Sequence, residues 1–330
     1  MLATCRIYLF TYKRNSLLPR AIKSIQNQTF TNWVCEVHND DPTDGFPAHF
    51  IECLQDSRFI IKNHTQNLGA TTCFNIAFAG SDEKYGSILE DDNWWEPQFL
   101  EEMISILDTN LNVDICWSNM NLWVEKGHNQ WENTLKTIWP TDKNNTLFEW
   151  FDLRQAMGAL HSNGSMLYRN ENAKELQIPN ECDFSIMEAV RERTFKFPIY
   201  LHHKTLANFA HTLNTSRSNN KSVWTGGQIL LLSSFLLNQQ NVLHSFKKSL
   251  QFYRKQKPSP VINFFLANLF LIKNDKLFRL FNLQDWLKIA KWMLLNLTEL
   301  NKINQYVKEN MVTYQFLKDK TNKRTKELKN

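Results

Sequence analysis

Hydrophobic residues follow two alternating periods along the first 110 residues of the chain. Compact apolar runs at 6–10, 33–37, 59–62 and 85–89 are typical of buried strands, and they alternate with helices predicted over 18–25, 71–79 and about 97–107. The last of these helices is expected to open at Trp94-Trp95-Glu96-Pro97, with Pro97 as its first residue. Strands that alternate with helices predict an α/β fold, a doubly wound and mostly parallel sheet that binds ligands at the carboxyl ends of its strands.

The pattern changes near residue 220, beyond which only helical periodicity remains. The helices predicted there cover 229–237, 242–253, 261–272 and 283–297, and a last one starts at about 301. Residues 221–330 contain 19 Lys and Arg and 6 Asp and Glu, whereas residues 1–220 contain 19 and 27. We therefore expect an α/β domain over 1–220 and a basic helical region over 221–330. The acidic domain suits cations and the basic region suits phosphates or anionic surfaces, although lysine-solvated helix faces would give the same charge.

Composition excludes several classes of protein. With 42% apolar and 22% charged residues, the 330-residue chain can bury a large core, which excludes a disordered protein. The six cysteines lack the spacing of a zinc site or of a disulfide framework, and they indicate free thiols in a reducing compartment. No charged leader precedes an apolar run at the start, and no apolar stretch of about 18 residues occurs. The expected location is cytoplasmic.

Adjacent carboxylates follow the fourth predicted strand, in Glu90-Asp91-Asp92-Asn93. Such groups repel one another unless a cation neutralises them, and their hard oxygen atoms suit Mn²⁺ or Mg²⁺. These ions in turn bind diphosphates. The segment therefore predicts a metal-bound nucleotide, and the alternative is an ordinary solvated loop.

The sequence resembles family 2 of the GT-A fold glycosyltransferases over roughly residues 4–218. Four motifs carry the resemblance in the family's order: Phe10-Thr11-Tyr12-Lys13-Arg14 is similar to P-T-Y-N-R, Asn39–Asp44 to D-D-G-S-T-D, Asn67–Asn75 to N-x-G-x-x-x-x-R-N and Leu89–Trp94 to L-D-D-D-D-W. The resemblance implies the GT-A fold, which is Rossmann-like and doubly wound with a mostly parallel sheet. The C-terminal helices would form an all-helical extension of this fold.

The resemblance also implies roles for individual residues. Thr11 and Tyr12 would line the base pocket, with the tyrosine ring stacked on uracil, and Asp40 would accept a hydrogen bond from the base. Asp91 would contact the ribose or assist the metal, and Asp92 would bind the divalent ion. The remaining nucleotide contacts expected from the same motifs are Arg14, Asn67 and Gly69.

An inverting transfer needs a base that takes the proton of the attacking acceptor hydroxyl. Gly164–Arg169 is similar to the family's G-S-x-x-(aromatic)-R strand, and the segment 180–186 resembles its E-D-x-D-L segment. The resemblance therefore implies Asp183 as the base, with Glu181 as the second choice, and the alternative is that either acid caps a helix over 184–191. His211, in a segment similar to the Y-R-x-H loop, would close over the diphosphate or add a metal ligand, unless it is simply a surface residue.

Several residues depart from the family pattern. Phe74 stands where the family has the arginine of its R-N pair, Phe10 replaces the proline, Lys13 the asparagine and Cys182 an acid. Phe74 cannot pair with a phosphate, so nucleotide affinity or base preference is expected to differ. The Q-x-x-R-W motif of processive polysaccharide synthases does not occur, which favours transfer of a single sugar.

The segment 283–297 combines Trp and Leu with Lys288 and Lys291 on the other side of the helix. This arrangement fits a helix in a membrane interface, near a lipid-linked acceptor at the inner face of the membrane. It fits a helical subdomain or a homodimer interface as well, and we prefer that simpler interpretation. Nucleic acid is not expected as a partner, because no reader motif accompanies the basic residues.

Together these features predict a metal-dependent, inverting glycosyltransferase that moves one sugar from a nucleotide-diphosphate donor, a UDP-sugar above all, to a glycan or lipid-linked acceptor. Mn²⁺ or Mg²⁺ would be the cofactor. A non-catalytic binding protein on the same fold is one alternative. A sugar-nucleotide nucleotidyltransferase is the other, but such an enzyme should carry a glycine-rich phosphate loop after the first strand, and the segment 11–16 contains no glycine.

Overall fold

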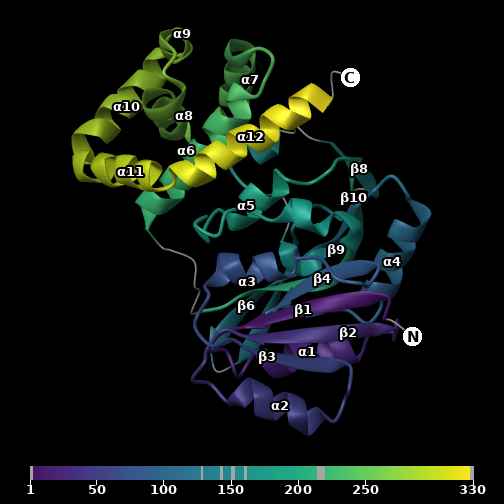
Figure 1. Cartoon of the computed structure of the whole chain (residues 1–330). Helices are drawn as coiled ribbons and strands as arrows, with labels where there is room; N and C mark the ends of the chain where they lie inside the picture. Colours follow the sequence, from purple (N-terminus) through teal and green to yellow (C-terminus); the bar gives the residue numbers. More distant parts are fainter. Residues whose placement is uncertain are drawn as a thin grey trace. The chain divides into compact units, whose positions relative to one another are not determined.

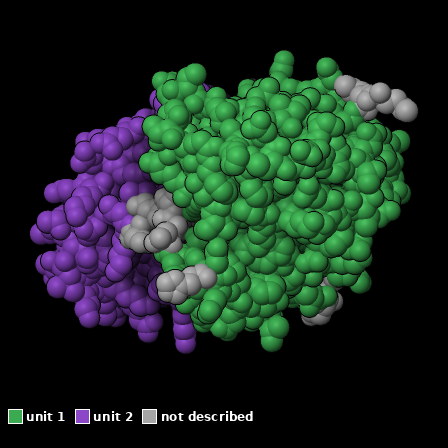
Figure 2. All heavy atoms as spheres, turned by 90° about the horizontal axis from the view of Figure 1, so that it is seen from below, with its two compact units in different colours: residues 1–150, 161–177, 195–216 green, residues 151–160, 178–194, 217–330 purple. Residues whose placement is uncertain are grey.

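The computed structural model describes residues 3–127, 129–141, 144–149, 153–159, 162–213 and 220–327, with side chains up to residue 320. The chain forms two compact units (Figure 1, Figure 2). Unit 1 contains residues 1–150, 161–177 and 195–216, and unit 2 contains residues 151–160, 178–194 and 217–330. Two segments that precede residue 220 therefore belong with the C-terminal helices, and the division of the chain at residue 220 stays a prediction.

Unit 1 is built on a mixed sheet whose strand order is β3-β2-β1-β4-β9-β6-β10-β5. Its first half is parallel and consists of β1 (Cys5–Thr11), β2 (Trp33–Asn39), β3 (Phe59–Asn63) and β4 (Tyr85–Glu90). These bounds confirm the strands predicted from the apolar runs. β1 and β4 are buried along most of their length, which explains why their sequences are apolar without alternation.

The second half of the sheet is formed by strands of mixed direction, β9 (Met166–Arg169), β6 (Ile115–Gly127), β10 (Ile199–His211) and β5 (Trp94–Trp95). β7 (Gln130–Thr137) pairs with β6, and β8 (Thr146–Phe148) pairs with β10. The helix predicted to open at Trp94 is wrong in its start. Trp94 and Trp95 pair with β10, and the helix begins at Phe99, after Pro97.

Helices α1 (Leu18–Gln26), α2 (Phe46–Leu54), α3 (Ala70–Ile76) and α4 (Phe99–Thr109) connect the strands of unit 1. Figure 1 shows α3 on the opposite side of β1 and β4 from α1 and α2, which is the doubly wound arrangement that the sequence predicts. α2 was not predicted, because Gly45 and Pro47 belong to a run of turn-forming residues. The proline lies in the first turn of the helix, where its missing N–H costs nothing.

Gly86 of β4 lies directly opposite Tyr168 of β9, and its missing side chain makes room for the tyrosine ring. A Cβ atom at Gly86 would lie 2.3 Å from the ring, whose hydroxyl donates to the carbonyl of Ala77. We expect Gly86→Ala to lower the free energy of unfolding by about 1–3 kcal/mol, measured by denaturant titration. Gly45→Ala is the matched control, because a Cβ there meets nothing within 4 Å. Equal stability of the two variants would contradict the packing of β4 against β9.

Unit 2 is helical in its described part. Its helices are α5 (Met187–Glu192), α6 (Lys221–Leu237), α7 (Val242–Arg254), α8 (Val261–Ala267) with a π-helical continuation (Asn268–Ile272), α9 (Asp275–Phe278), α10 (Leu283–Leu295), α11 (Leu297–Glu309) and α12 (Met311–Glu327). In α6, all residues from Ile229 to Leu236 are buried, as expected of a central helix that is apolar on every side. The α/β fold with a C-terminal helical extension is thus confirmed.

No helix in the described part of the chain combines the length and the apolar character that crossing a bilayer requires.

Candidate active site

The register of the parallel strands brings their carboxyl ends to one edge of unit 1. Thr11 is paired with Asn39, Asn39 with Asn63, and Phe10 with Glu90. The residues that follow these ends are the predicted site residues and one further histidine: Tyr12, Asp40, His64, Asp91 and Asp92. The structure therefore places the predicted base-binding and metal-binding side chains at the same edge of the sheet.

Asp91 is buried, with 4% of its surface exposed. Its Oδ2 accepts a hydrogen bond from the backbone N–H of Tyr12 at 3.3 Å, which ties the end of β4 to the end of β1. Burial, followed by the charge of Asp92, raises the pKa of Asp91 to about 7, although Arg14 acts in the opposite direction. The positive charge near Asp91 and Asp92 is therefore too small to stabilise both carboxylates in their ionised form.

Arg14 supplies the positive charge that the pair does have. Its Nη1 forms an ion pair with Oδ2 of Asp92 and lies 3.5 Å from Oδ1 of Asp91. Two neighbouring carboxylates with hard oxygen atoms, one of them buried, fit a divalent ion such as Mn²⁺ or Mg²⁺. Asp91 and Asp92 are the residues that could hold it, and Arg14 is then available for the phosphates.

Arg20 of α1 supports the same segment and was not predicted from the sequence. One of its guanidinium nitrogens donates to the backbone carbonyl of Asp92 at 2.7 Å. The guanidinium carbon lies 3.9 Å from the ring centroid of Trp94 and 4.2 Å from that of Trp131 on β7. The two indole planes are inclined at 70° to each other, so the cation contacts both rings at the corner that they form. The two tryptophans are the sequence feature from which the role of Arg20 could have been predicted. However, Trp131 lies near Arg20 only because β6 and β7 form a hairpin.

Tyr12 is 45% exposed, and the ammonium of Lys13 lies over its ring, 5.0 Å from the centroid, so a planar ligand that stacks on this face would displace the lysine. The next residue, Lys13, has φ 56°, in the left-handed region that Asn tolerates better than Lys. This conformation gives a reason for the asparagine that stands at this position in the P-T-Y-N-R pattern. Lys13 keeps the turn at a modest cost in backbone energy.

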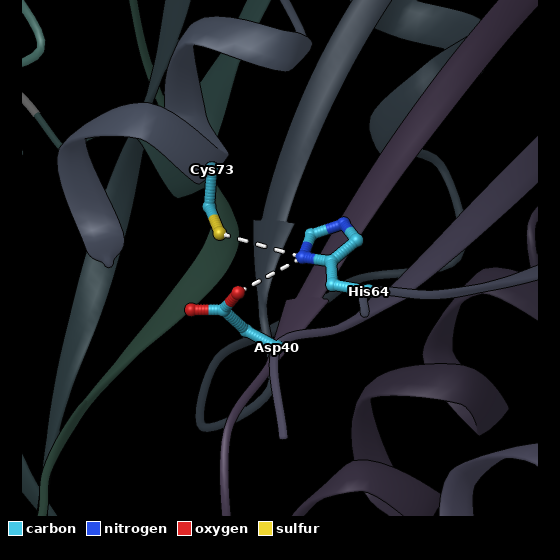
Figure 3. Close-up of side chains that lie close together, drawn as sticks. All are labelled: Asp40, His64 and Cys73. Carbon is cyan, nitrogen blue, oxygen red and sulfur yellow. Dashed lines mark hydrogen bonds and ion pairs between the residues drawn. The ribbon is translucent and has the colours of Figure 1, made fainter. Parts of the chain in front are cut away.

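Asp40 anchors the segment that contains Asn67 and Gly69. Its oxygens accept hydrogen bonds from the Asn67 side chain (3.0 Å), from the backbone N–H groups of Leu68 (2.8 Å) and Gly69 (3.1 Å), and from Nδ1 of His64 (2.9 Å; Figure 3). A carboxylate offers about four acceptor sites, so these four donors occupy them. The predicted hydrogen bond from Asp40 to a base would have to share these oxygens, and it stays a prediction.

Two departures from the family pattern contact each other in the structure. The rings of Phe10 and Phe74 pack with their centroids 5.1 Å apart, and both residues are buried. Phe74 therefore fills space against Phe10, and neither residue can pair with a phosphate. Phe74, in place of the family's arginine, and Phe10, in place of its proline, therefore form one apolar contact with each other.

His211 is the remaining predicted residue of unit 1, and it follows Ala210, whose backbone N–H donates to Oδ1 of Asn93 at 3.0 Å. His211, the exposed last residue of β10, packs edge-on against Phe209. Among the described side chains, the group of three metal-ligating residues whose ligand atoms lie within 4.8 Å of one another is Asp40, His64 and Cys73, and it does not include His211. The role of His211 as a metal ligand stays a prediction.

Asp183 and Glu181 belong to unit 2. Oδ1 of Asp183 accepts a hydrogen bond from the backbone N–H of Ser185 at 2.7 Å, in the turn that precedes α5. Together with burial, the charge of Asp183 raises the pKa of the Tyr306 hydroxyl on α11. Glu181 is exposed. The local turn resembles the capping alternative, except that α5 begins only at Met187, and the role of Asp183 as a base stays a prediction.

Comparison with solved structures identifies the fold. The fold of S. aureus TarS residues 1–349, solved in complex with UDP, is similar over 93% of this chain and 91% of that chain, with a TM-score of 0.60 and 11% sequence identity. The same TarS fragment in complex with UDP-GlcNAc gives a TM-score of 0.58 at 12% identity, over 96% and 90% of the two chains. The fold is that of the GT-A glycosyltransferases.

Residues 7–160, just under half of the chain, match the family model for glycosyl transferase family 2, so this part of the chain is similar to that family. An uncharacterized glycosyltransferase of Haemophilus influenzae is 28% identical over 121 residues, which are 36% of this chain and 38% of that protein. The UDP-Glc:alpha-D-GlcNAc-diphosphoundecaprenol beta-1,3-glucosyltransferase WfgD of Escherichia coli is 26% identical over 116 residues, 35% of this chain and 45% of that protein. The chain thus aligns with less than half the length of these relatives.

Proposed function

We propose that this protein transfers a single sugar from a nucleotide-diphosphate sugar, a UDP-sugar above all, to a hydroxyl of a glycan or lipid-linked acceptor, with inversion at the anomeric carbon. The observation that carries the proposal is the carboxylate pair Asp91 and Asp92 at the carboxyl end of β4, held by Arg14 and Arg20. The glucosyltransferase WfgD, which its name describes as acting on a diphosphoundecaprenol-linked sugar, supports a lipid-linked acceptor.

The chain's own residues would share the work as follows. Tyr12 stacks on the base, and Arg14 moves from the carboxylates to the diphosphate. Asp183 accepts the proton of the acceptor hydroxyl while its oxygen bonds to the anomeric carbon and the bond to the nucleotide diphosphate breaks. A divalent ion at Asp91 and Asp92 would offset the negative charge that develops on the leaving diphosphate.

The pKa of Asp91 predicts how metal binding depends on pH. Its folded-state value of about 7 lies above the ordinary value of 3.8, so Asp91 holds a proton in the folded protein where the unfolded chain has lost it. Stability therefore falls as pH rises through this window, and a metal must displace the proton below about pH 7. We expect Mn²⁺ affinity, measured by calorimetry without nucleotide, to rise between about pH 5 and pH 7 and then level off. A constant affinity over this range would contradict the assignment of Asp91 as a ligand.

The exposure of one apolar face of α10 leads us to replace the interpretation that the sequence favoured. For the acceptor, we propose that α10 rests on an anionic membrane surface through an apolar stripe, defined as Leu283, Trp286, Leu287, Ala290 and Leu294. These residues share one face of the helix and are all exposed, with Leu283 at 75%, Leu287 at 63% and Leu294 at 80%. Lys288 and Lys291, which lie away from the stripe on the same helix, are exposed as well, and their long side chains suit negatively charged headgroups.

Vesicle sedimentation tests the apolar stripe. We expect binding to vesicles that contain phosphatidylglycerol but not to pure phosphatidylcholine vesicles, and a loss of at least about tenfold in affinity in Leu287→Gln/Leu294→Gln. Leu111→Gln/Leu135→Gln changes two equally exposed leucines of unit 1 and should bind as wild type does. Dimers in sedimentation equilibrium that the first double variant abolishes, without vesicle binding, would overturn the membrane proposal in favour of a homodimer interface.

A product assay distinguishes the proposed function from its two alternatives. Radiolabelled UDP-sugars are incubated with the protein, Mn²⁺ and a lipid-linked acceptor extract, and the label should move to the acceptor with release of UDP. A nucleotidyltransferase would instead form a UDP-sugar from UTP and a sugar 1-phosphate. A non-catalytic binding protein would bind UDP and give neither product.

A further inference from the structure

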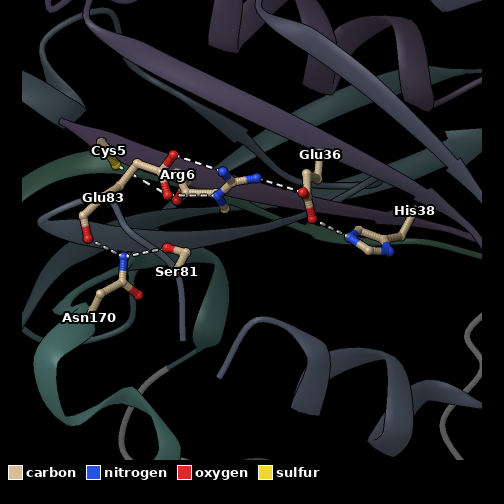
Figure 4. Close-up of polar contacts among 7 residues, drawn as sticks. All are labelled: Cys5, Arg6, Glu36, His38, Ser81, Glu83 and Asn170. Carbon is tan, nitrogen blue, oxygen red and sulfur yellow. Dashed lines mark hydrogen bonds and ion pairs between the residues drawn. The ribbon is translucent and has the colours of Figure 1, made fainter. Parts of the chain in front are cut away.

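Two histidines lie in contact just behind Asp40. Nδ1 of His38, on β2, is 3.1 Å from Nε2 of His64, which follows β3. Each ring uses its other nitrogen on a carboxylate: Nδ1 of His64 lies 2.9 Å from Oδ1 of Asp40 (Figure 3), and Nε2 of His38 lies 3.2 Å from Oε2 of Glu36 (Figure 4). Both rings are nearly buried, with side-chain exposures of 5% for His38 and 10% for His64.

Counting hydrogens shows that two neutral histidines provide one hydrogen fewer than the contacts of this chain of groups need. The three contacts, Asp40 to His64, His64 to His38 and His38 to Glu36, each need one hydrogen. A neutral imidazole carries a single hydrogen, and the carboxylates fix it on Nδ1 of His64 and on Nε2 of His38. The two facing nitrogens would then present lone pairs to each other at 3.1 Å. A third hydrogen between them removes this conflict.

The carboxylates at either end are poor places for the extra proton. The four donors on Asp40 are satisfied only if it is a carboxylate. The hydrogen bond from His38, followed by the charge of Arg6, holds the pKa of Glu36 below its usual range despite burial. Arg6 is itself paired with Glu36 at 2.5 Å and with Glu83 at 2.7 Å (Figure 4). The position that remains for a third hydrogen is between the two imidazoles.

A metal ion does not explain the contact equally well. Two nitrogens 3.1 Å apart could be neighbouring ligands of one ion, but a metal site needs more than two protein ligands. Among the described side chains, the group that could hold an ion is Asp40, His64 and Cys73, and it does not include His38. Cys73, whose sulfur lies 4.0 Å from Nδ1 of His64, is held as a thiol, since burial and the charge of Asp40 raise its pKa well above the usual range. The oxygens of Asp40 are filled by N–H groups. The cluster is therefore a hydrogen-bonded one.

We propose that His38 and His64 share one proton, and that through it they position the nucleotide-binding loop formed by Asn67, Leu68 and Gly69. His64 donates to Oδ1 of Asp40, and the same oxygen accepts a hydrogen bond from the backbone N–H of Leu68. The histidine therefore fixes the orientation of the carboxylate that binds the loop amides. Both are positioning residues, since neither touches the reacting atoms. The assignment of this loop to the nucleotide rests on the proposed function, whereas the shared proton does not.

The shared proton makes the loop sensitive to alkaline pH. When the proton leaves, the two lone pairs repel, the rings separate and His64 loses its fixed position against Asp40. The charged and titratable groups that surround the pair are Arg6 and Tyr8 on β1, Glu36 on β2, Lys62 on β3, Asp40 and, on α3, Cys73.

Imidazole NMR tests the proton directly. Protein labelled with ¹⁵N in histidine should show three N–H hydrogens on the four nitrogens of His38 and His64 near pH 7, with one strongly deshielded hydrogen between the rings. His38→Gln supplies an amide N–H to His64 without an extra proton, so that hydrogen should vanish from its spectrum. Two N–H hydrogens in the wild type at neutral pH would overturn the proposal.

The backbone amides of Leu68 and Gly69 test the positioning role without any nucleotide. Their signals should shift in the wild type as the shared proton is lost, and they should stay constant over the same pH range in His38→Gln. The matched control is His49→Gln, which changes an exposed histidine of α2 and should titrate as the wild type does. If the signals of these two amides do not change when the proton is lost, the histidine pair does not position the loop, and its role is limited to the stability of the sheet.

Binding of UDP with Mn²⁺ extends the test to the donor site. We expect the wild-type affinity to fall roughly tenfold relative to His38→Gln when the proton is lost, as for one charge-assisted hydrogen bond. Equal pH profiles in the two proteins would remove the link between the pair and the nucleotide. If neither protein binds UDP, the proposed donor is wrong. The shared proton is then tested by the NMR spectrum alone, because that measurement does not use a nucleotide.

Discussion

Asp183→Asn is expected to abolish sugar transfer while leaving nucleotide binding intact. The asparagine keeps the oxygen that accepts the N–H of Ser185, so the turn before α5 is preserved. It cannot accept the proton of the acceptor hydroxyl, and loss of a positioned base typically slows a reaction by about 10² to 10⁴. Transfer of label from a UDP-sugar measures kcat, and calorimetry measures UDP affinity on the same preparation.

The matched control is Asp275→Asn, which removes an exposed carboxylate from the same unit and should transfer at the wild-type rate. Glu181→Gln separates the first-choice base from the second. If Glu181→Gln is inactive and Asp183→Asn is active, the proton acceptor is Glu181. Full activity in both variants would contradict base catalysis from this segment.

Asp92→Asn is expected to reduce transfer by about a thousandfold, because stabilisation of the leaving diphosphate by a metal amounts to several kcal/mol. The change also relieves the repulsion between Asp92 and Asp91, the second-largest cause that raises the pKa of Asp91. We therefore expect the variant to unfold at the same temperature as the wild type or above it. Activity at varied Mn²⁺, together with a thermal melt, measures both effects.

Asp82→Asn, at an exposed carboxylate outside the site, should leave both activity and melting temperature unchanged. An Asp92→Asn protein that melts far below the wild type would show that its lost activity reflects misfolding. Retained activity with unchanged Mn²⁺ dependence would remove Asp92 from the metal site.

The parallel half of the sheet was predictable because its strands are local apolar runs. β5 was not, since Trp94 and Trp95 form a strand only by pairing with Ala207 and Asn208, more than a hundred residues away. The same limit applies to α2, whose sequence begins with turn-forming residues and whose apolar face is explained only by packing against β2 and β3.

In the site, adjacency in the sequence was enough to predict Asp91 and Asp92. The contacts of their cationic partners, by contrast, could not be predicted from neighbouring residues in the sequence. Arg14 lies in a motif, although its ion pair with Asp92 depends on the register of β1 and β4. Arg20 lies in an ordinary helix, and its contact with the rings of both Trp94 and Trp131 requires the folded hairpin.

The departures from the family pattern also needed the structure. In the sequence, Phe10 and Phe74 are two unrelated replacements 64 residues apart, whereas in the fold their rings are in contact. Asp40 and His64 show the same limit, since a hydrogen bond between residues 24 positions apart depends on the pairing of β2 with β3. Side-chain partners of this kind are set by strand register, which residue type alone does not specify.

The central claim is that the carboxyl edge of the parallel strands binds a nucleotide diphosphate together with a divalent ion. Calorimetric titration of UDP into the wild-type protein, with and without Mn²⁺, tests it most directly. We predict binding in the micromolar range that requires Mn²⁺, with guanosine and thymidine diphosphates binding more weakly. The absence of binding by all three nucleotides in the presence of Mn²⁺ would contradict the account.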